Sequence, residues 1–225
     1  MWECRGFVDL LPRAVQVEQA AGDADTVVEV WAEEARAIAD VVPQRRAEFG
    51  ITRTCARRAL QRLGVEPQAI PVGVDREPVW PRGVVGSLTH GAGLHAAAVA
   101  LKTSVRAIGI DVEANRSLPR ETLNLVAGPA EMRALDSLAS KWPEVAWDRL
   151  LFSAKETIFK AWFPATGRWL GFTDCVLTIE PGTATFTSRL PPGDGPGAAA
   201  GHSVVEGRWG VSGQRLLTAA VLATR

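Results

Sequence analysis

The sequence has no net charge, because 25 Lys and Arg residues are balanced by 25 Asp and Glu residues. A protein without an excess of basic residues generates no overall field that attracts nucleic acid or an anionic membrane. We therefore expect no nucleic acid and no membrane as a partner. Any anion that the protein binds must be recognised by a local cluster of basic side chains.

Cysteine is scarce, and long apolar runs are absent. Cys4, Cys55 and Cys175 are widely spaced and form no CxxC pair, which argues against a disulfide framework and against a zinc site. No apolar stretch is long enough to cross a bilayer, and the first residues lack a basic segment followed by an apolar one. The sequence predicts a cytoplasmic protein.

Several common catalytic motifs are missing as well. The chain has three histidines and no GxSxG sequence, so a Ser-His-Asp hydrolase is poorly supported. Neither GxGxxG nor a Walker-type phosphate loop occurs. If the protein binds a nucleotide, it does so with a different framework.

Helical and strand patterns alternate along the chain, which at 225 residues and 47% hydrophobic content is able to bury a sizeable core. The patterns predict helices over 28–40, from Pro43 to about Gly64, and over 147–163. They predict strands over 84–89, 96–101, 107–112, 175–179, 183–190, 204–211 and 216–222, with a mobile loop over 191–201. A helix followed by a hairpin occurs in both halves, and LHAAAVAL faintly resembles LLTAAVLA. We interpret this as an α+β fold with a duplicated unit.

The segment Ile108-Gly-Ile-Asp-Val-Glu113 is an apolar strand that ends in two carboxylates. Alternation along a strand places Asp111 and Glu113 on one face. Two carboxylates so close repel each other unless a cation lies between them, and Mg²⁺ prefers such oxygen ligands. The alternative is an ordinary solvated strand end.

The predicted helix RLLFSAKETIFKAWFP is apolar around most of its circumference. Its narrow polar strip includes Glu156 and Lys160, four residues apart on one face. These two residues could form an exposed ion pair, but a helix buried nearly all round more readily presents its polar strip to a cleft. Lys155 lies beside the apolar stripe and would have to extend along it to reach the same cleft.

Basic residues also follow one edge of the helix predicted after Pro43. Arg46, Arg53 and Arg57 project together and could bind a phosphate, or they could form a solvated basic face. In Gly86-Ser-Leu-Thr-His-Gly91, His90 could donate an N–H to a phosphate oxygen or serve a structural role.

Four motifs between about residues 43 and 172 occur in a characteristic order. They are RRAEFGITRTCAR, REPVWPRGVVGSLTH, GIDVE and WDRLLFSAKETIFKAWFPATGRWLGF. This ordered set resembles the surfactin-type 4'-phosphopantetheinyl transferases, and most closely the actinobacterial branch that serves polyketide and nonribosomal peptide synthetases. The resemblance implies an α+β pseudo-dimer of two similar halves, 1–105 and 106–225, with the active site in the cleft between them.

The resemblance also implies an activity. Such an enzyme transfers 4'-phosphopantetheine from coenzyme A to a serine of an apo acyl or peptidyl carrier protein and releases 3',5'-ADP. We expect it to act as a monomer with Mg²⁺, or Mn²⁺ in its place, as cofactor. Carrier docking is expected over residues 114–130, with Leu118 and Leu123 as its exposed residues.

Individual roles follow from the residues that match the family motifs. Metal ligands fall on Asp111, Glu113 and Glu156. Glu156 would take the proton from the carrier serine, directly or through a water, and Lys160 would stabilise the leaving group. The residues implied for coenzyme A binding are Arg46, Arg53, Arg57, Arg76, Glu77, Pro78, Thr89, His90, Lys155 and Lys160.

Two alternatives to this activity remain. A catalytically inactive relative would bind coenzyme A or a carrier protein without transferring the phosphopantetheine arm. An unrelated Mg²⁺ phosphodiesterase would use the same carboxylates with water as the nucleophile.

Overall fold

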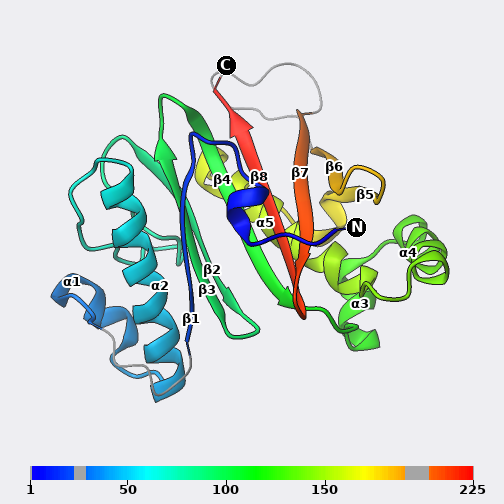
Figure 1. Cartoon of the computed structure of the whole chain (residues 1–225), viewed down its shortest axis with the longest axis horizontal. Helices are drawn as coiled ribbons and strands as arrows, with labels where there is room; N and C mark the ends of the chain where they lie inside the picture. The colour runs from blue at the N-terminus through cyan, green and yellow to red at the C-terminus, as the bar shows by residue number, and fades with distance from the viewer. Residues whose placement is uncertain (1, 23–28, 191–202, 225) are drawn as a thin grey trace.

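The computed structural model describes residues 2–22, 29–190 and 203–224 of the chain. The loop predicted over 191–201 lies outside the described residues. In the described part, two antiparallel sheets and five α-helices form an α+β fold (Figure 1). None of these helices is long and apolar enough to span a membrane.

The first half contains the smaller sheet, with strand order β1-β3-β2. Helix α2 packs on this sheet, and the buried side chains between them include Ala56, Leu60 and Val99. The elements are η1 (Phe7–Asp9), β1 (Gln16–Ala21), α1 (Ala32–Ala35), η2 (Arg36–Ile38), α2 (Pro43–Arg62), β2 (Val84–Gly91) and β3 (Leu94–Leu101).

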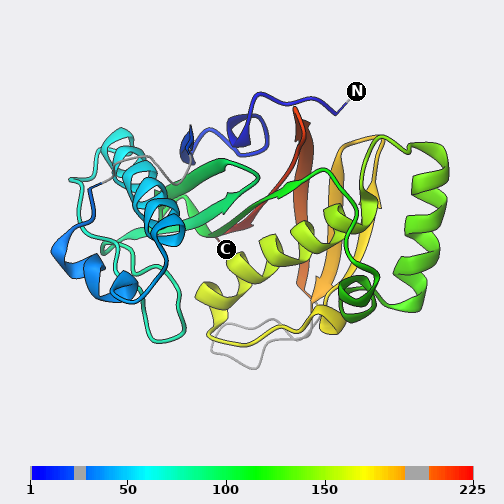
Figure 2. The same ribbon diagram turned by 90° about the horizontal axis from the view of Figure 1, so that it is seen from below.

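The second half contains a five-stranded sheet, with strand order β4-β8-β7-β6-β5, and helix α5 crosses one face of it (Figure 2). The elements are β4 (Val105–Ala114), α3 (Arg120–Val126), α4 (Pro129–Lys141), α5 (Trp147–Thr166), η3 (Phe172–Asp174), β5 (Val176–Glu180), β6 (Thr185–Leu190), β7 (Ser203–Ser212) and β8 (Arg215–Ala223). A helix packed on an antiparallel sheet thus occurs in both halves. The fold is the pseudo-dimer that the resemblance implied, and its division into 1–105 and 106–225 stays a prediction.

Strand β2 of the first half lies against β4 of the second, and side-chain hydroxyls join them. The Ser87 hydroxyl accepts a hydrogen bond from the Ile110 N–H at 3.1 Å, and the Thr89 hydroxyl accepts one from the Val112 N–H at 3.3 Å. Buried N–H groups need such partners where no backbone ladder supplies them. These bonds fix the two halves together at the point where Asp111 emerges.

Helix α5 lies unusually close to β4. A Cβ atom added at Gly109 would stand only 1.9 Å from the Thr157 carbonyl oxygen, so glycine is required there for the helix to approach the strand. The helix also continues past the predicted stop at Pro164 and ends at Gly167, whose φ of 66° suits a C-terminal glycine. This packing carries Lys160 towards β4.

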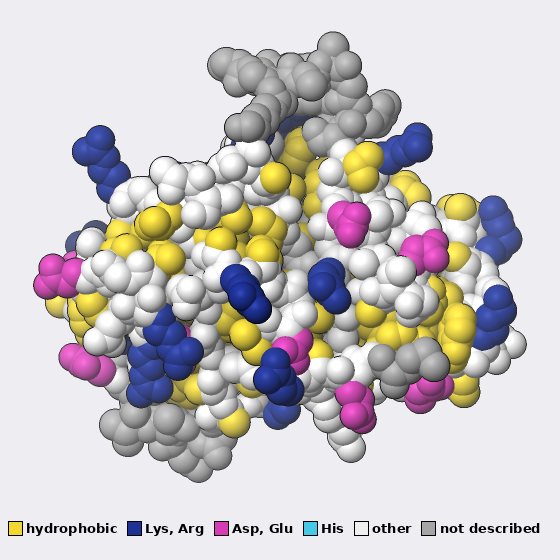
Figure 3. Space-filling view, turned by 45° about the horizontal axis from the view of Figure 1, so that its top comes forward, with side chains coloured by type: hydrophobic (Ala, Val, Ile, Leu, Met, Phe, Trp, Pro, Cys, Tyr) yellow, Lys and Arg dark blue, Asp and Glu magenta, His cyan; other side chains and the backbone are white. Residues whose placement is uncertain are grey.

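The N-terminal segment connects the two halves. The Cys4 N–H donates to the Val211 carbonyl of β7 at 2.8 Å, and the Trp2 side chain packs against Trp147 and Trp209. The chain then passes η1 and enters β1, which pairs with β3 of the first half (Figure 1). On the face shown in Figure 3, basic and acidic side chains are interspersed.

Candidate active site

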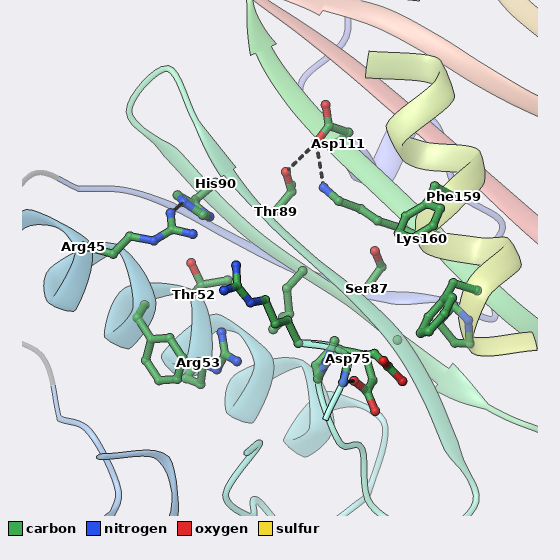
Figure 4. Close-up of a pocket in the computed structure, with 18 residues that line it drawn as sticks. Arg45, Thr52, Arg53, Asp75, Ser87, Thr89, His90, Asp111, Phe159 and Lys160 are labelled. Carbon is green, nitrogen blue, oxygen red and sulfur yellow. Dashed lines mark hydrogen bonds and ion pairs between the residues drawn. The ribbon is translucent and has the colours of Figure 1, made fainter. Parts of the chain in front are cut away.

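A pocket of about 390 Å³ lies between the two halves, with residues of α2, the 75–78 segment and β2 on one side and residues of β4 and α5 on the other. Figure 4 shows the side chains around it. The lining residues are Arg45, Phe49, Thr52, Arg53, Asp75, Arg76, Glu77, Pro78, Gly86, Ser87, Leu88, Thr89, His90, Asp111, Phe159, Lys160, Phe163 and Pro164. Eight of the predicted site residues, one of them a predicted metal ligand, are therefore brought together here: Arg53, Arg76, Glu77, Pro78, Thr89, His90, Asp111 and Lys160.

Asp111 is the carboxylate of the pocket with the most complete set of hydrogen bonds. Its Oδ1 accepts from the Lys160 ammonium at 2.7 Å and from the Thr89 hydroxyl at 3.2 Å (Figure 4). Its Oδ2 accepts from the Ser153 hydroxyl at 2.8 Å. Three donors, one of them charged, hold this buried side chain in a single orientation.

Glu113 and Glu156 belong to the same electrostatic environment but do not line the pocket. Burial, together with the charge of Asp111, raises the pKa of Glu113, and an ion pair with Arg149 at 3.0 Å opposes that rise. Burial also raises the pKa of Glu156; the Lys160 charge opposes this, and the charges of Asp111 and Glu113 add to it. Glu113 and Glu156, whose pKa values are raised by burial and by neighbouring carboxylate charges, favour a cation nearby.

The donor chemistry of these carboxylates fits a hard divalent cation such as Mg²⁺. The geometry is not that of a formed metal site, however. Among the residues described, no three His, Cys, Asp or Glu side chains are close enough together to hold one metal ion. Lys160 and Arg149 instead provide the positive charge beside Asp111 and Glu113.

The predicted arginine cluster divides into different environments. Arg53 is buried in the pocket wall, where it donates to the Ile70 carbonyl at 3.3 Å and stacks over the Phe49 ring. Burial lowers the pKa of Arg53 to about 10. The charge of Glu34 opposes this decrease, and the charges of the neighbouring arginines add to it. Arg53 thus lies in the pocket wall with a backbone carbonyl and an aromatic ring as its contacts.

Arg46 and Arg57 are not brought to the pocket. Arg46 donates to the Ile38 and Ala39 carbonyls, at 2.8 and 3.3 Å. Arg57 forms a buried ion pair with Glu34 at 2.9 Å. A helical-wheel projection of α2 could not distinguish these environments. They depend on η2 and α1, which are separate elements that pack on α2.

Arg45, which the sequence analysis did not single out, lines the pocket where Arg46 was expected. Its guanidinium contacts the His90 ring, and both side chains are near Glu48. Burial and the Arg45 charge lower the pKa of His90 to about 4, so the imidazole is neutral near pH 7. The signal available in the sequence was the adjacent pair of arginines. Their spacing alone did not show which of the two lines the pocket.

Lys155 is likewise directed away from the pocket. Its ammonium group is buried in an ion pair with Glu131 at 2.9 Å and donates to the Val126 and Phe172 carbonyls, both at 2.8 Å. All three donors of the ammonium are therefore satisfied on the far side of α5. Its role in the structure is to attach α4 and the segment after α5 to this helix.

The chain matches two family models, one for each half. Residues 33–100 match the 4'-phosphopantetheinyl transferase N-terminal domain, and residues 107–204 match the 4'-phosphopantetheinyl transferase superfamily. The first match includes the arginines of α2 and the strand that carries Thr89. The second includes Asp111, Glu113, Glu156 and Lys160.

Relatives of known name cover most of the chain. The 4'-phosphopantetheinyl transferase Svp of Streptomyces mobaraensis is 44% identical over 95% of this chain and 88% of its own length. The 4'-phosphopantetheinyl transferase PptT of Mycobacterium tuberculosis is 45% identical over 84% of this chain and 85% of its own length. Enterobactin synthase component D of Escherichia coli K12 is more distant, at 36% identity over 52% of this chain and 55% of its own length.

Proposed function

We propose a mechanism that starts from the family of the protein: the chain belongs to the 4'-phosphopantetheinyl transferases, and it is 44–45% identical to actinobacterial members. Its activity is the transfer of 4'-phosphopantetheine from coenzyme A to a carrier protein. The observation that carries the mechanism is the pocket between the halves, which combines Arg53 and Thr89 of the first half with Asp111 and Lys160 of the second.

We propose that coenzyme A lies in this pocket with its phosphates near the basic side chains. Arg53 and Arg45 on α2 would bind the 3'-phosphate, because a guanidinium group recognises phosphate oxygens in a bidentate manner. Arg76, Glu77 and Pro78 would lie along the adenosine. Thr89 and His90 would contact phosphate oxygens at the end of β2.

The proposed cofactor is Mg²⁺, or Mn²⁺ in its place, held by Asp111, Glu113 and Glu156. When bound, it would neutralise charge on the diphosphate of coenzyme A. For Asp111 and Glu113 to bind a cation, Lys160 and Arg149, which now pair with these carboxylates, would have to move aside. The Lys160 ammonium, at 2.7 Å from Asp111, is suitably close to turn towards the diphosphate instead.

The proton transfers can be assigned to residues of this chain. Glu156 would accept the proton of the carrier serine, directly or through a water, and its raised pKa suits this task. Lys160 would stabilise the departing 3',5'-ADP. The bond that forms joins the serine oxygen to the β-phosphorus of coenzyme A, and the bond that breaks is the diphosphate linkage.

The finer features of this proposal concern partners and location. We propose that the carriers are apo acyl or peptidyl carrier proteins, that the enzyme acts as a monomer, and that it is cytoplasmic. The three cysteines are free in the structure, which agrees with a reducing compartment.

The direct test is incubation of the purified protein with coenzyme A, Mg²⁺ and several apo carrier proteins. Intact mass of the carrier should increase by one phosphopantetheine group, and EDTA should prevent the increase. Release of phosphopantetheine without any carrier would instead identify a phosphodiesterase. Binding of coenzyme A with no transfer to any carrier would favour the inactive relative.

A further inference from the structure

Three buried hydroxyl groups lie behind Asp111, on the side away from the pocket. Ser153 and Thr157 are one turn apart on α5, and Thr218 faces them from β8. Thr218 is also the residue directly opposite Asp111 in the pairing of β4 with β8. All three hydroxyl residues are completely buried. None of them lines the pocket.

The distances join these groups into a continuous chain of hydrogen bonds. Thr157 Oγ1 is 2.7 Å from Thr218 Oγ1, and Thr218 Oγ1 is 2.8 Å from Ser153 Oγ. Ser153 Oγ is in turn 2.8 Å from Asp111 Oδ2. The chain therefore begins in the interior between α5 and β8 and ends on the carboxylate.

Counting the protons gives this chain a direction. Each hydroxyl has one proton to donate, and a carboxylate paired with Lys160 only accepts. The Ser153 proton is thus committed to Asp111, so Ser153 must accept from Thr218. If Thr218 donated instead to the Ser153 carbonyl, at 3.1 Å, two oxygens would face each other at 2.8 Å without a proton between them. Thr218 then accepts from Thr157.

We propose that Ser153 is a positioning residue, which orients the Asp111 carboxylate through a one-way hydrogen-bond chain that begins at Thr157 and passes through Thr218. The chain holds Oδ2 on the buried side. Oδ1 is left at the pocket, where its partners Thr89 and Lys160 lie (Figure 4). Hydrogen bonds in series polarise one another, so the last bond to the carboxylate gains strength from the first two.

Gly109 allows the hydrogen-bond chain to extend from Thr157 to Asp111. The short approach of α5 to β4 at this glycine lets the Ser153 and Thr157 side chains meet Thr218 without an intervening water. Ser153 and Thr157 are four residues apart, so both face the sheet from one side of the helix. The polar strip of α5 therefore has two functions, with Lys160 facing the pocket and the hydroxyls fixing the carboxylate from behind.

The inference rests on the proposed role of Asp111 as a metal ligand, and the test separates the two. The probe is Mn²⁺, whose affinity is measured by electron paramagnetic resonance on the whole protein with saturating coenzyme A. Residues that orient a metal ligand typically change metal affinity by about 10- to 100-fold when they are removed. We expect a loss in this range for Ser153→Ala.

Thr218 allows a matched pair of variants. Thr218→Val removes the hydroxyl and keeps the shape, and we expect it to weaken Mn²⁺ binding less than Ser153→Ala does. Thr218→Ser keeps the hydroxyl and should bind Mn²⁺ as the parent protein does, even if its melting temperature is lower. Ser188→Ala removes a buried hydroxyl that bonds to the Val176 carbonyl of a different strand, and it should leave Mn²⁺ affinity unchanged.

Three results would overturn the inference, and they are distinguishable. If Asp111→Asn weakens Mn²⁺ binding but Ser153→Ala and Thr218→Val do not, Asp111 is a ligand that needs no positioning chain. If Asp111→Asn also leaves Mn²⁺ affinity unchanged, the proposed metal role of Asp111 fails and the inference fails with it. Equal losses for Thr218→Val and Thr218→Ser would show that packing, not the hydroxyl, matters.

Discussion

Lys160 Nζ lies 2.7 Å from Asp111 Oδ1 and also 3.2 Å from the Ile110 carbonyl oxygen, so α5 and β4 are joined by a charged contact at the floor of the pocket. The ammonium occupies a position beside the carboxylate that a metal ion could share only after Lys160 moves. This relationship makes Asp111 the residue whose replacement is most informative.

We predict that Asp111→Ala abolishes transfer and leaves the fold intact. The substitution removes the acceptor of Lys160, Thr89 and Ser153, but Lys160 is partly exposed and can be hydrated. The measurement is carrier mass after incubation with coenzyme A and Mg²⁺, with circular dichroism as the control for folding. Turnover near the parent rate at ordinary Mg²⁺ concentration would remove Asp111 from the active site.

A second prediction concerns the 3'-phosphate of coenzyme A. Arg53→Ala should raise the KM for coenzyme A by about 10-fold or more, since a hydrogen bond to a charged group contributes about 1.5–3 kcal/mol. It should have much less effect with dephospho-coenzyme A as donor, because that donor lacks the phosphate. Arg46→Ala is the matched control, as Arg46 lies on the same helix but bonds to the Ile38 and Ala39 carbonyls. Equal losses with both donors would argue against a 3'-phosphate role for Arg53.

Much of the fold could be predicted from periodicity and turn residues. The hairpin of β2 and β3, the strand before Asp111 and the helix after residue 147 all occur where the pattern indicated them. The helix predicted over 28–40 is instead a short α1 followed by η2. Strand β1 and helices α3 and α4 were not predicted, because their stability depends on partners distant in sequence.

The sequence predicted which residues belong to the site better than it predicted where their side chains point. The motifs located Asp111, Lys160, Thr89 and Arg53, all of which line the pocket. They could not show that Lys155 points to Glu131, because that direction depends on where α4 packs. Helical spacing alone also gave no reason to distinguish Arg57, whose buried partner Glu34 is 23 residues away.

The buried pair of Arg57 with Glu34 yields a prediction about stability. Glu34 is fully buried and also accepts a hydrogen bond from the Ile70 N–H at 2.8 Å, so it needs its cation. Arg57→Ala would leave this carboxylate without a charged partner, and breaking such a pair costs about 3–5 kcal/mol of unfolding free energy. The measurement is urea denaturation followed by tryptophan fluorescence. A change under about 1 kcal/mol would indicate that water reaches Glu34 in the folded protein.

Glu156 provides a prediction about pH. Its pKa is raised above the ordinary value of 4.5, chiefly by burial, so the folded protein without ligands binds its proton more tightly than the unfolded chain does. The resulting stability is fully present below pH 4.5 and is lost as the pH rises through the raised pKa. Glu156→Gln should therefore weaken the decline in stability as the pH approaches neutrality.

The measurement is the melting temperature of the parent and the Glu156→Gln variant, each without ligands, at a series of pH values. The variant should gain on the parent as the pH rises. Asp136→Asn on α4 is a suitable control, because it removes a carboxylate from an exposed position. A difference in melting temperature between the parent and Glu156→Gln that is the same at every pH would contradict the prediction that ionised Glu156 destabilises the folded protein.

The last prediction locates the docking surface for the carrier within residues 114–130. Leu118 and Leu123, which the sequence analysis expected to be exposed, are only partly so, and Leu123 packs against the core of the second half. Leu125 on α3 is 74% exposed and is the better candidate. Leu125→Asp should raise the KM for the carrier protein by about 10-fold and leave the KM for coenzyme A unchanged, because α3 is separate from the pocket lining. Val176→Asp, at another exposed apolar residue, serves as the control. Unchanged carrier kinetics for Leu125→Asp would place the docking surface on a different part of the molecule.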